Sequence, residues 1–168
     1  EEKKESQKES HEVAIEMADK IEGEAIWNEE KRKVVWLSLR YSNEPSLNAQ
    51  IGTCDYYLYE GLAGIILFMK AIQVSTGRYE DVCRAAENVL FEYTDSVYEG
   101  KRDPDSDYTG LYCGEGAIVY AYQALFRFTG ERRFLFYAVK HAEILKRLLE
   151  YDKSIDILYG NAGAIIAF

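Results

Sequence analysis

The sequence predicts an all-α fold, in which helical hairpins with inner and outer helices form part of an α/α toroid, with one short strand near the N-terminus. Three observations support this prediction. The 168 residues include only two prolines, and the helix-favouring residues Ala, Leu, Glu and Lys are abundant. A glycine motif occurs three times, each time at the start of an apolar run. Two of these runs are followed by a two-faced segment, as in a hairpin of one buried and one surface helix.

The repeated motif reads "LYEGLAGIILF", then "LYCGEGAIVYA", then "ILYGNAGAIIA". The first glycines of the three copies are 53 and then 46 residues apart, and the Thr-Gly pairs that end the first two runs are also 53 apart. Two landmarks with one period indicate a structural repeat. These landmarks are Gly61, Gly114, Gly160, Thr76-Gly77 and Thr129-Gly130.

Each full repeat predicts two kinds of helix. Residues 62–75 and 115–128 are apolar nearly all round, which predicts helices buried on most sides. Thr-Gly then ends each helix, because glycine adopts the left-handed conformation easily. Residues 79–93 and 134–150 are two-faced, which predicts an outer layer. In the second of these segments one side carries Phe134, Ala138, His141, Leu145 and Leu148.

Six glycines form the structural motif at the starts of the inner helices. The first of each pair allows a tight turn into the helix, and the second allows close packing at the crowded end of a ring. Shaping turns is the commoner role of such glycines, so any effect on function is indirect: several helix N-termini would rim one cavity. The six are Gly61, Gly64, Gly114, Gly116, Gly160 and Gly163.

The chain divides into residues 1–50, which lead into the helical repeats, and residues 51–168, which hold two and a half hairpins. Residues 1–12 are charged and predict a frayed helix start or a tail. An amphipathic helix follows, with Val13, Met17, Ile21 and Ala25 as its apolar stripe. Residues 33–41 predict a strand, and residues 42–55 a loop. The chain stops inside an apolar run, so we expect a segment truncated at its C-terminus.

Composition argues against several classes of function. The net charge is −9 and the pI about 4.8, and an acidic surface repels nucleic acid. No apolar stretch reaches the ~18 residues that read as a membrane span, since Lys70 interrupts the longest. Three widely spaced cysteines, Cys54, Cys83 and Cys113, indicate free thiols in the cytoplasm.

The motifs resemble a known family. "LYEGLAGI" and "DILYGNAGA" are similar to the inner-helix motifs of lanthionine synthetase C-like (LanC-like) cyclases, which are α/α toroids. Upstream, "ADKIEGEAIW" and "VVWLSL" resemble the entry into the cyclase domain of class II lanthipeptide synthetases, the LanM type. The resemblance covers residues 13–168.

This resemblance implies a bifunctional cytoplasmic enzyme of lantibiotic biosynthesis. A kinase-like dehydratase half uses ATP and Mg²⁺ to dehydrate Ser and Thr of a precursor peptide. The cyclase toroid holds one Zn²⁺, which activates a peptide Cys thiol for addition to the dehydroamino acid, giving (methyl)lanthionine rings. This segment would be a scaffold part of the cyclase domain, inactive alone, with the precursor peptide and the remainder of the synthetase chain as its partners.

The zinc ligands that the resemblance implies, two Cys and one His, are not expected in this segment. Cys113 lies one residue before its glycine, where the family's ligand cysteines lie two before, so we expect a buried free thiol. Cys54 falls in a predicted loop and Cys83 on an outer helix. His11 lies in the tail, and His141 lies midway along an outer helix, where a packed or solvated histidine is the commoner outcome.

Asp156 is the one functional residue that the resemblance carries over. The family has an aspartate at this position, which faces the cavity near the metal and orients a histidine or takes part in proton transfer. From the residues alone, an Asp before a helix is equally an N-cap or loop residue.

Two other functions remain open. One is a LanC-like toroid that binds peptides or thiols without catalysis. The other is a glycoside-processing toroid that uses carboxylates such as Glu60, Glu115 and Asp156, although the chain has only Trp27 and Trp36 for a sugar cleft. Residues 94–110 predict a polar, disordered loop. Tyrosines at the helix starts predict packing at the mouth of the ring or a peptide-contacting rim; they are Tyr56, Tyr57, Tyr59, Tyr112 and Tyr159.

Overall fold

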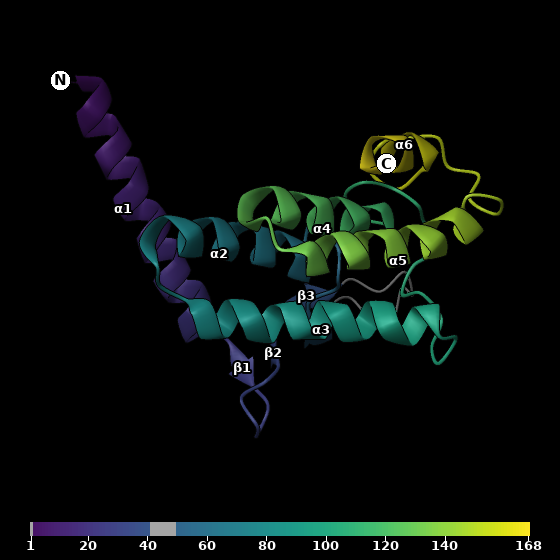
Figure 1. The fold of residues 1–168 in the computed structure, drawn as a ribbon, viewed down its shortest axis with the longest axis horizontal. Coiled ribbons are helices and arrows are strands. Elements are labelled where there is room, and N and C mark those ends of the chain that lie inside the picture. The colour runs from purple at the N-terminus through teal and green to yellow at the C-terminus, as the bar shows by residue number, and fades with distance from the viewer. Residues whose placement is uncertain (1, 41–49) are drawn as a thin grey trace.

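A computed structural model of the chain describes residues 2–40 and 50–168. These residues form six helices and four short strands, so the predicted all-α class is confirmed. The helices are joined in hairpins, consistent with a partial toroid (Figure 1). In chain order the elements are α1 (Glu2–Gly23), β1 (Ile26–Trp27), β2 (Val34–Val35), β3 (Leu37–Arg40), β4 (Gln50–Thr53), α2 (Leu62–Thr76), α3 (Glu80–Tyr98), α4 (Gly116–Thr129), α5 (Arg132–Leu148) and α6 (Asn161–Ala167).

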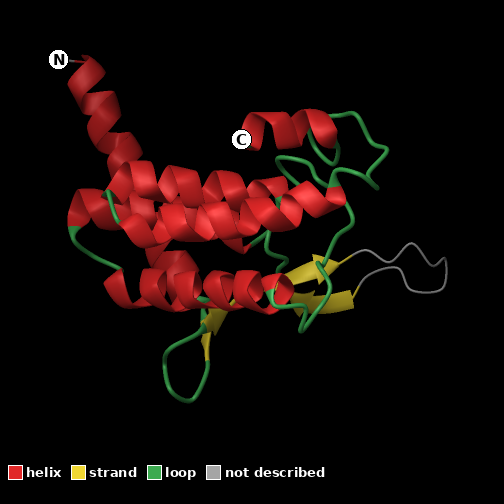
Figure 2. Cartoon of the chain, turned by 45° about the vertical axis from the view of Figure 1, so that its right-hand side comes forward, coloured by secondary structure: helices red, strands yellow, loops and turns green. Residues whose placement is uncertain are grey.

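The helices lie in the two layers that the repeat predicts. Inner helix α2 packs on α4, and α4 packs on α6, while the outer helices α3 and α5 pack on each other and each on the inner helix of its own hairpin. Helices α2 to α5 run nearly side by side, α1 crosses them at a steep angle, and α6 lies beyond α4 (Figures 1 and 2). In the second hairpin α4 is buried on most sides and α5 buries one face, as expected for an inner and an outer helix. In the first hairpin the contrast is absent, because α2 leaves Val74 exposed and buries fewer residues than α3 does.

Both inner helices end at the predicted Thr-Gly pairs. Gly77 has φ 74° and Gly130 has φ 72°, the left-handed region that favours glycine. The Gly77 N–H donates to the Gln73 carbonyl, and the Gly130 N–H donates to the Phe126 carbonyl. These bonds close the last helical turn and reverse the chain into the outer helix.

Helix α3 is longer than predicted. Residues 94–98 are helical, so the predicted loop of residues 94–110 begins only after Tyr98. The sequence looked polar there, but Thr94 and Val97 are buried against the neighbouring helices, and this packing extends the helix. His141 on α5 is also fully buried, so of the two outcomes expected for it, packed or solvated, the structure shows the packed one.

The apolar stripe predicted for α1 is half wrong. Val13 and Met17 are exposed, at 54% and 53%, and Ala18 is the residue that is fully buried. A small residue allows α1 to approach α2 closely, and polar contacts set the rotation of the helix: the Tyr79 hydroxyl donates to the Asp19 carboxylate at 2.6 Å.

The strand predicted at residues 33–41 is two strands, and the predicted loop at residues 42–55 contains a third. Trp36 separates β2 from β3, because its indole is buried in the core and donates to the Ile21 carbonyl at 2.7 Å. Strand β2 pairs antiparallel with β1, and β3 pairs antiparallel with β4. The part of the predicted loop at residues 42–49 lies outside the described residues.

A buried ion cluster joins the two hairpins. Glu87 of α3 is 2% exposed, and its Oε2 accepts from Arg133 of α5 at 2.8 Å. Lys70 of α2, 6% exposed, places its Nζ 2.9 Å from Oε1 of Glu87, as a charge contact rather than a well-directed hydrogen bond. The cluster therefore ties three helices together.

In residues 2–40 and 50–168, no helix combines the length and the apolar character that crossing a membrane requires.

Candidate functional site

The three glycine motifs lie together and are joined by backbone hydrogen bonds. The amides of Leu58 and Tyr59 in the first turn donate to the Tyr112 carbonyl of the second turn. Equivalent amides of the second turn, at Leu111 and Tyr112, donate to the carbonyls of residues 157 and 158 in the third turn. The bond from Tyr59 to Tyr112 recurs at the same motif position as the bond from Tyr112 to Leu158, so the repeat in the sequence is also a repeat in space.

The motif glycines are required for close backbone approach. A Cβ on Gly61 would lie 2.6 Å from the Tyr57 amide nitrogen, and a Cβ on Gly163 would lie 2.3 Å from the Leu111 amide nitrogen of the neighbouring turn. Gly61 has φ −137°, so sterics rather than a left-handed conformation select glycine. Contacts under 3.0 Å would likewise arise at Gly64, Gly114, Gly116 and Gly160.

The turns and the loop before the second turn line an open pocket of about 590 Å³, which we call the tyrosine pocket. Four of the five tyrosines singled out in the sequence line it, and Tyr56 instead stacks on Tyr93 with ring centroids 3.9 Å apart. The lining residues are Asp55, Tyr57, Tyr59, Glu60, Asp105, Ser106, Tyr108, Tyr112, Cys113 and Tyr159.

Three lining residues, Asp105, Ser106 and Tyr108, were not expected at a site from the sequence. They belong to the segment predicted to be a disordered loop. The Asp105 amide donates to the buried Tyr93 hydroxyl at 3.0 Å, which holds this loop against the pocket. No periodic pattern in the sequence signals that contact.

The pocket contains a protonated thiol. Burial raises the pKa of Cys113, and a hydrogen bond with Tyr159 lowers it less than burial and the nearby carboxylates of Asp55, Glu60 and Asp156 raise it. The thiol form is therefore favoured near neutral pH. Cys113 is half-buried rather than buried, which corrects the prediction, because it faces the pocket.

Within the described part of the chain, no three His, Cys, Asp or Glu side chains are grouped so that they could hold a metal ion. Cys83 is buried on α3, and Cys54 follows β4. His141 bonds to Glu115 instead of facing the pocket. The residues present therefore do not fit the zinc centre that the resemblance implies.

Asp156 lies on the surface and organises the third turn. Its Oδ1 accepts from the Leu158 and Tyr159 amides at 2.8 and 2.9 Å. In the other two turns the amides equivalent to that of Leu158, on Tyr59 and Tyr112, bind carbonyls of the next turn, so for Leu158 the carboxylate takes the place of a backbone acceptor. Its charge also raises the pKa of Tyr159, after the larger effect of Cys113. Asp156 thus lies beside the pocket, and its catalytic role stays a prediction.

Glu115 is unsuited to a sugar cleft. Its side chain has 0% exposure and is hydrogen-bonded to Tyr57, Tyr93 and His141 beneath the pocket. Of the three carboxylates considered for a glycoside-processing site, Glu60 and Asp156 are exposed and Glu115 is not.

Asp152 anchors the second turn to the third. Its Oδ2 accepts from the Thr109 amide and hydroxyl at 2.8 and 2.7 Å, and its Oδ1 accepts from the Ser154 amide at 2.8 Å. Burial acts to raise the pKa of this carboxyl, but the hydrogen bonds from Thr109 and Ser154 outweigh it, and the pKa is below its ordinary value.

We expect the hydrogen bonds to Asp152 to make the stability of the chain depend on pH in the acid range. A carboxyl with a folded-state pKa below its unfolded value of about 3.9 stabilises the fold above that pH, and the contribution is lost as pH falls through the folded pKa. Between pH 5 and pH 3, urea unfolding should show a larger fall in the free energy of unfolding for the wild type than for Asp152→Asn. Exposed Asp107→Asn is the control; equal losses in all three proteins would contradict the assignment.

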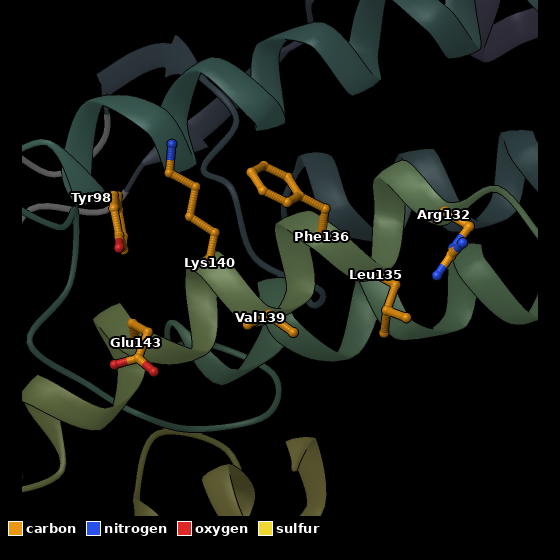
Figure 3. Close-up of a pocket in the computed structure, with 7 residues that line it drawn as sticks. All are labelled: Tyr98, Arg132, Leu135, Phe136, Val139, Lys140 and Glu143. Carbon is orange, nitrogen blue, oxygen red and sulfur yellow. The ribbon is translucent and has the colours of Figure 1, made fainter.

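Two apolar grooves lie outside the tyrosine pocket. One, of about 660 Å³, adjoins it through Tyr59 and Tyr112 and is lined also by Leu58, Tyr120 and Ile166. The other, also about 660 Å³, lies on the outer layer along α5 and contains none of the motif residues (Figure 3). Its lining residues are Tyr98, Arg132, Leu135, Phe136, Val139, Lys140 and Glu143.

Hairpins whose inner helices start at glycine turns around one pocket define a protein of the partial α/α toroid class. The family model of the lanthionine synthetase C-like protein matches residues 52–168. Because the match covers more than half of the chain, the chain belongs to this family, which has a lanthionine synthetase or cyclase-type function. The predicted LanC-like resemblance is confirmed at this level. No curated protein matches the sequence.

Proposed function

We propose that this chain is a scaffold part of a lanthionine cyclase and contributes the tyrosine pocket to the binding of a precursor peptide. The observation that carries the proposal is the convergence of the three glycine turns on that pocket, within a chain of the LanC-like family. Tyrosine rings offer large contact area with one polar atom each, which suits a peptide. The apolar groove adjoining the pocket extends the surface that a peptide would cover.

The chemistry that these residues supply is binding and orientation. Tyr59, Tyr112 and Tyr159 are each at least 40% exposed and offer hydroxyls to peptide carbonyls. The carboxylates of Asp55 and Glu60 favour a cationic or neutral peptide over an anionic one. We propose that zinc and its ligands in the complete cyclase come from other residues, since the described ones do not fit a zinc centre.

The finer assignment is a class II synthetase of the LanM type, with a dehydratase half that uses ATP and Mg²⁺. The packing of residues 13–40 supports it, because α1 and Trp36 belong to the same hydrophobic core as α2 and α3. Residues 13–40, which precede the helical repeats, are thus part of the cyclase core, as we expect where a cyclase domain follows another domain in one chain. Asp156 is proposed to assist proton transfer beside the pocket, which its position next to Cys113 and Tyr159 supports.

A peptide-binding experiment tests the proposal. The probe is a fluorescein-labelled synthetic peptide with one Cys and one dehydroalanine, followed by anisotropy. We expect Tyr112→Ala to weaken binding about tenfold, as removal of an aromatic contact of roughly 1.4 kcal/mol would. Phe136→Ala in the outer groove is the matched control, because it removes an exposed aromatic ring outside the pocket. Equal effects of the two changes would contradict the proposal.

Metal content distinguishes a scaffold from a complete cyclase centre. Purified chain, dialysed against zinc and then against buffer, is expected to hold far less than one zinc per molecule. Mass spectrometry of the same peptide after incubation should show no thioether product. A non-catalytic LanC-like peptide-binding toroid remains the second candidate. It is favoured if the chain joined to the rest of its protein still forms no ring, and stoichiometric tightly held zinc would contradict both readings.

A further inference from the structure

A buried polar network lies beneath the tyrosine pocket, and its centre is the Glu115 carboxylate. Oε1 of Glu115 accepts from the hydroxyls of Tyr57 and Tyr93, at 2.8 and 2.6 Å. Oε2 lies 2.8 Å from Nε2 of His141, and neither Glu115 nor His141 is exposed to solvent. In such surroundings every contact at hydrogen-bond distance requires its own proton.

The far side of the network fixes the proton on the other nitrogen of His141. The Tyr122 hydroxyl donates to the Leu90 carbonyl at 2.8 Å, because a carbonyl can only accept. The 2.9 Å contact between Thr94 and Tyr122 must then use the threonine proton. Thr94 has no second proton for its 3.0 Å contact with Nδ1 of His141, so Nδ1 carries a hydrogen and donates to Thr94.

Counting protons over the whole network leaves one more to place. The contacts at Glu115 with Tyr57 and Tyr93 use the two tyrosine protons. Burial, and then the charge of Glu115, raise the pKa of both phenols well above the ordinary value, so both hydroxyls stay protonated. A neutral imidazole has a single hydrogen bound to nitrogen, and in His141 this hydrogen is already on Nδ1. The Nε2–Oε2 contact therefore needs an additional proton.

We infer that Glu115 and His141 share this additional proton, and that the pair thereby positions two walls of the tyrosine pocket. The first wall is Tyr57, whose ring lines the pocket while its hydroxyl is held by Glu115. The second wall is the loop of Asp105 and Ser106, held through Tyr93. This positioning role goes beyond the proposed function and does not depend on which ligand the pocket binds.

The groups around the pair come from every element packed against it. Tyr57 comes from the first turn, Tyr93 and Thr94 from α3, and Tyr122 from α4. These neighbours are hydroxyls rather than charged groups. On α5 the adjacent Lys140 is paired with Asp95 at 2.6 Å, so its charge is already matched.

Nitrogen NMR of His141 tests the inference in the wild-type chain. A spectrum of ¹⁵N-labelled protein at pH 7 is expected to show Nδ1 bonded to hydrogen, with Nε2 either protonated or strongly hydrogen-bonded to a proton on Glu115. His141→Gln assigns the signals, since His11 is then the remaining histidine. An unprotonated Nδ1 would overturn the inference, because Thr94 would then be the donor.

A matched pair of variants tests the positioning role. In Glu115→Gln the amide oxygen accepts from both tyrosines, and the amide nitrogen supplies the hydrogen that Nε2 needs. We expect this variant to melt slightly below the wild type and to keep Nδ1 protonated. In Glu115→Leu the hydroxyls of Tyr57 and Tyr93 and the His141 ring lose their partner, and we expect melting on the order of 10 °C lower.

Modification of Cys113 by iodoacetamide reports the shape of the pocket, in a Cys54→Ser background that leaves Cys83 buried. Glu115→Gln is expected to react at the rate of the parent, and Glu115→Leu several-fold faster. If Glu115→Gln reacts as fast as Glu115→Leu, or destabilises the chain equally, a shared proton is not what holds the pocket, and the inference fails. Should Glu115→Leu not fold, the NMR result and Glu115→Gln still decide.

Discussion

Gly61→Ala is expected to lower the free energy of unfolding by about 3 kcal/mol. The new Cβ would lie 2.0 Å from Oδ1 of Asp55, 2.6 Å from the Tyr57 amide nitrogen and 2.7 Å from the Asp55 carbonyl oxygen. The Asp55 carboxylate can swing away, but the two backbone atoms can move only with the whole first turn. Urea unfolding followed by circular dichroism measures the effect.

Gly23→Ala is the control for this change. Gly23 ends α1, has no atom within 4 Å of the Cβ position, and is expected to give a change within about 1 kcal/mol, in the stabilising direction. If Gly61→Ala were as mild as Gly23→Ala, close backbone approach would not be the reason for the motif glycine. The tight packing of the turns would then have to be revised.

Glu87→Ala should destabilise the chain by about 3 kcal/mol, because it removes the near carboxylate of buried Lys70 and leaves that charge with only Glu131 among the described residues, at 3.9 Å. Arg133 also loses its contact with Glu87, but its Nε still donates to Glu131 at 2.8 Å and its side chain is partly exposed. Removing one partner of a buried pair costs more than the pair contributes, since the remaining ion keeps its desolvation penalty. The shift in the midpoint of urea unfolding gives the change in the free energy of unfolding, provided that its slope against urea concentration is unchanged.

Glu92→Ala on the same helix serves as the comparison. Glu92 is exposed and pairs with Lys33 on the surface, so its removal should change stability by no more than about 1 kcal/mol. Similar losses for the two variants would show that Glu87 is not in a buried charge cluster. A small loss for Glu87→Ala alone would mean that water reaches Lys70.

The hairpins could be predicted from the sequence because their signals are local. A glycine pair, an apolar run and a Thr-Gly stop lie within one stretch of chain, and α2 and α4 begin within one residue of the predicted positions. The clustering of tyrosines near the helix starts predicted either packing or a peptide-contacting rim there, and four of the five tyrosines line the pocket. Tyr59 and Tyr112 have the same place in their motifs, two residues before the first glycine, and Tyr159 lies one residue before its glycine, so the packed turns bring all three to the pocket.

The remaining features depend on contacts between distant segments. Val13 and Met17 fit a helical stripe as well as Ala18 does, and only the packing of α1 on α2 selects the buried face. Trp36 divides a continuous β-prone stretch because its indole finds the Ile21 carbonyl in the core. The pairing of Glu115, which precedes α4, with His141 of α5 joins residues 26 apart, and no pattern in the sequence indicates it.

Backbone hydrogen bonds link the three turns, so the backbone frame of the pocket forms independently of the side chains that line it. Leu58, Tyr59, Leu111 and Tyr112 are held through their amides, which every residue type except proline possesses. Replacing the side chains that project from this frame should therefore alter which molecules are recognised while the frame itself persists. Specificity can drift at these positions through evolution, or be redesigned, without the helices being rebuilt.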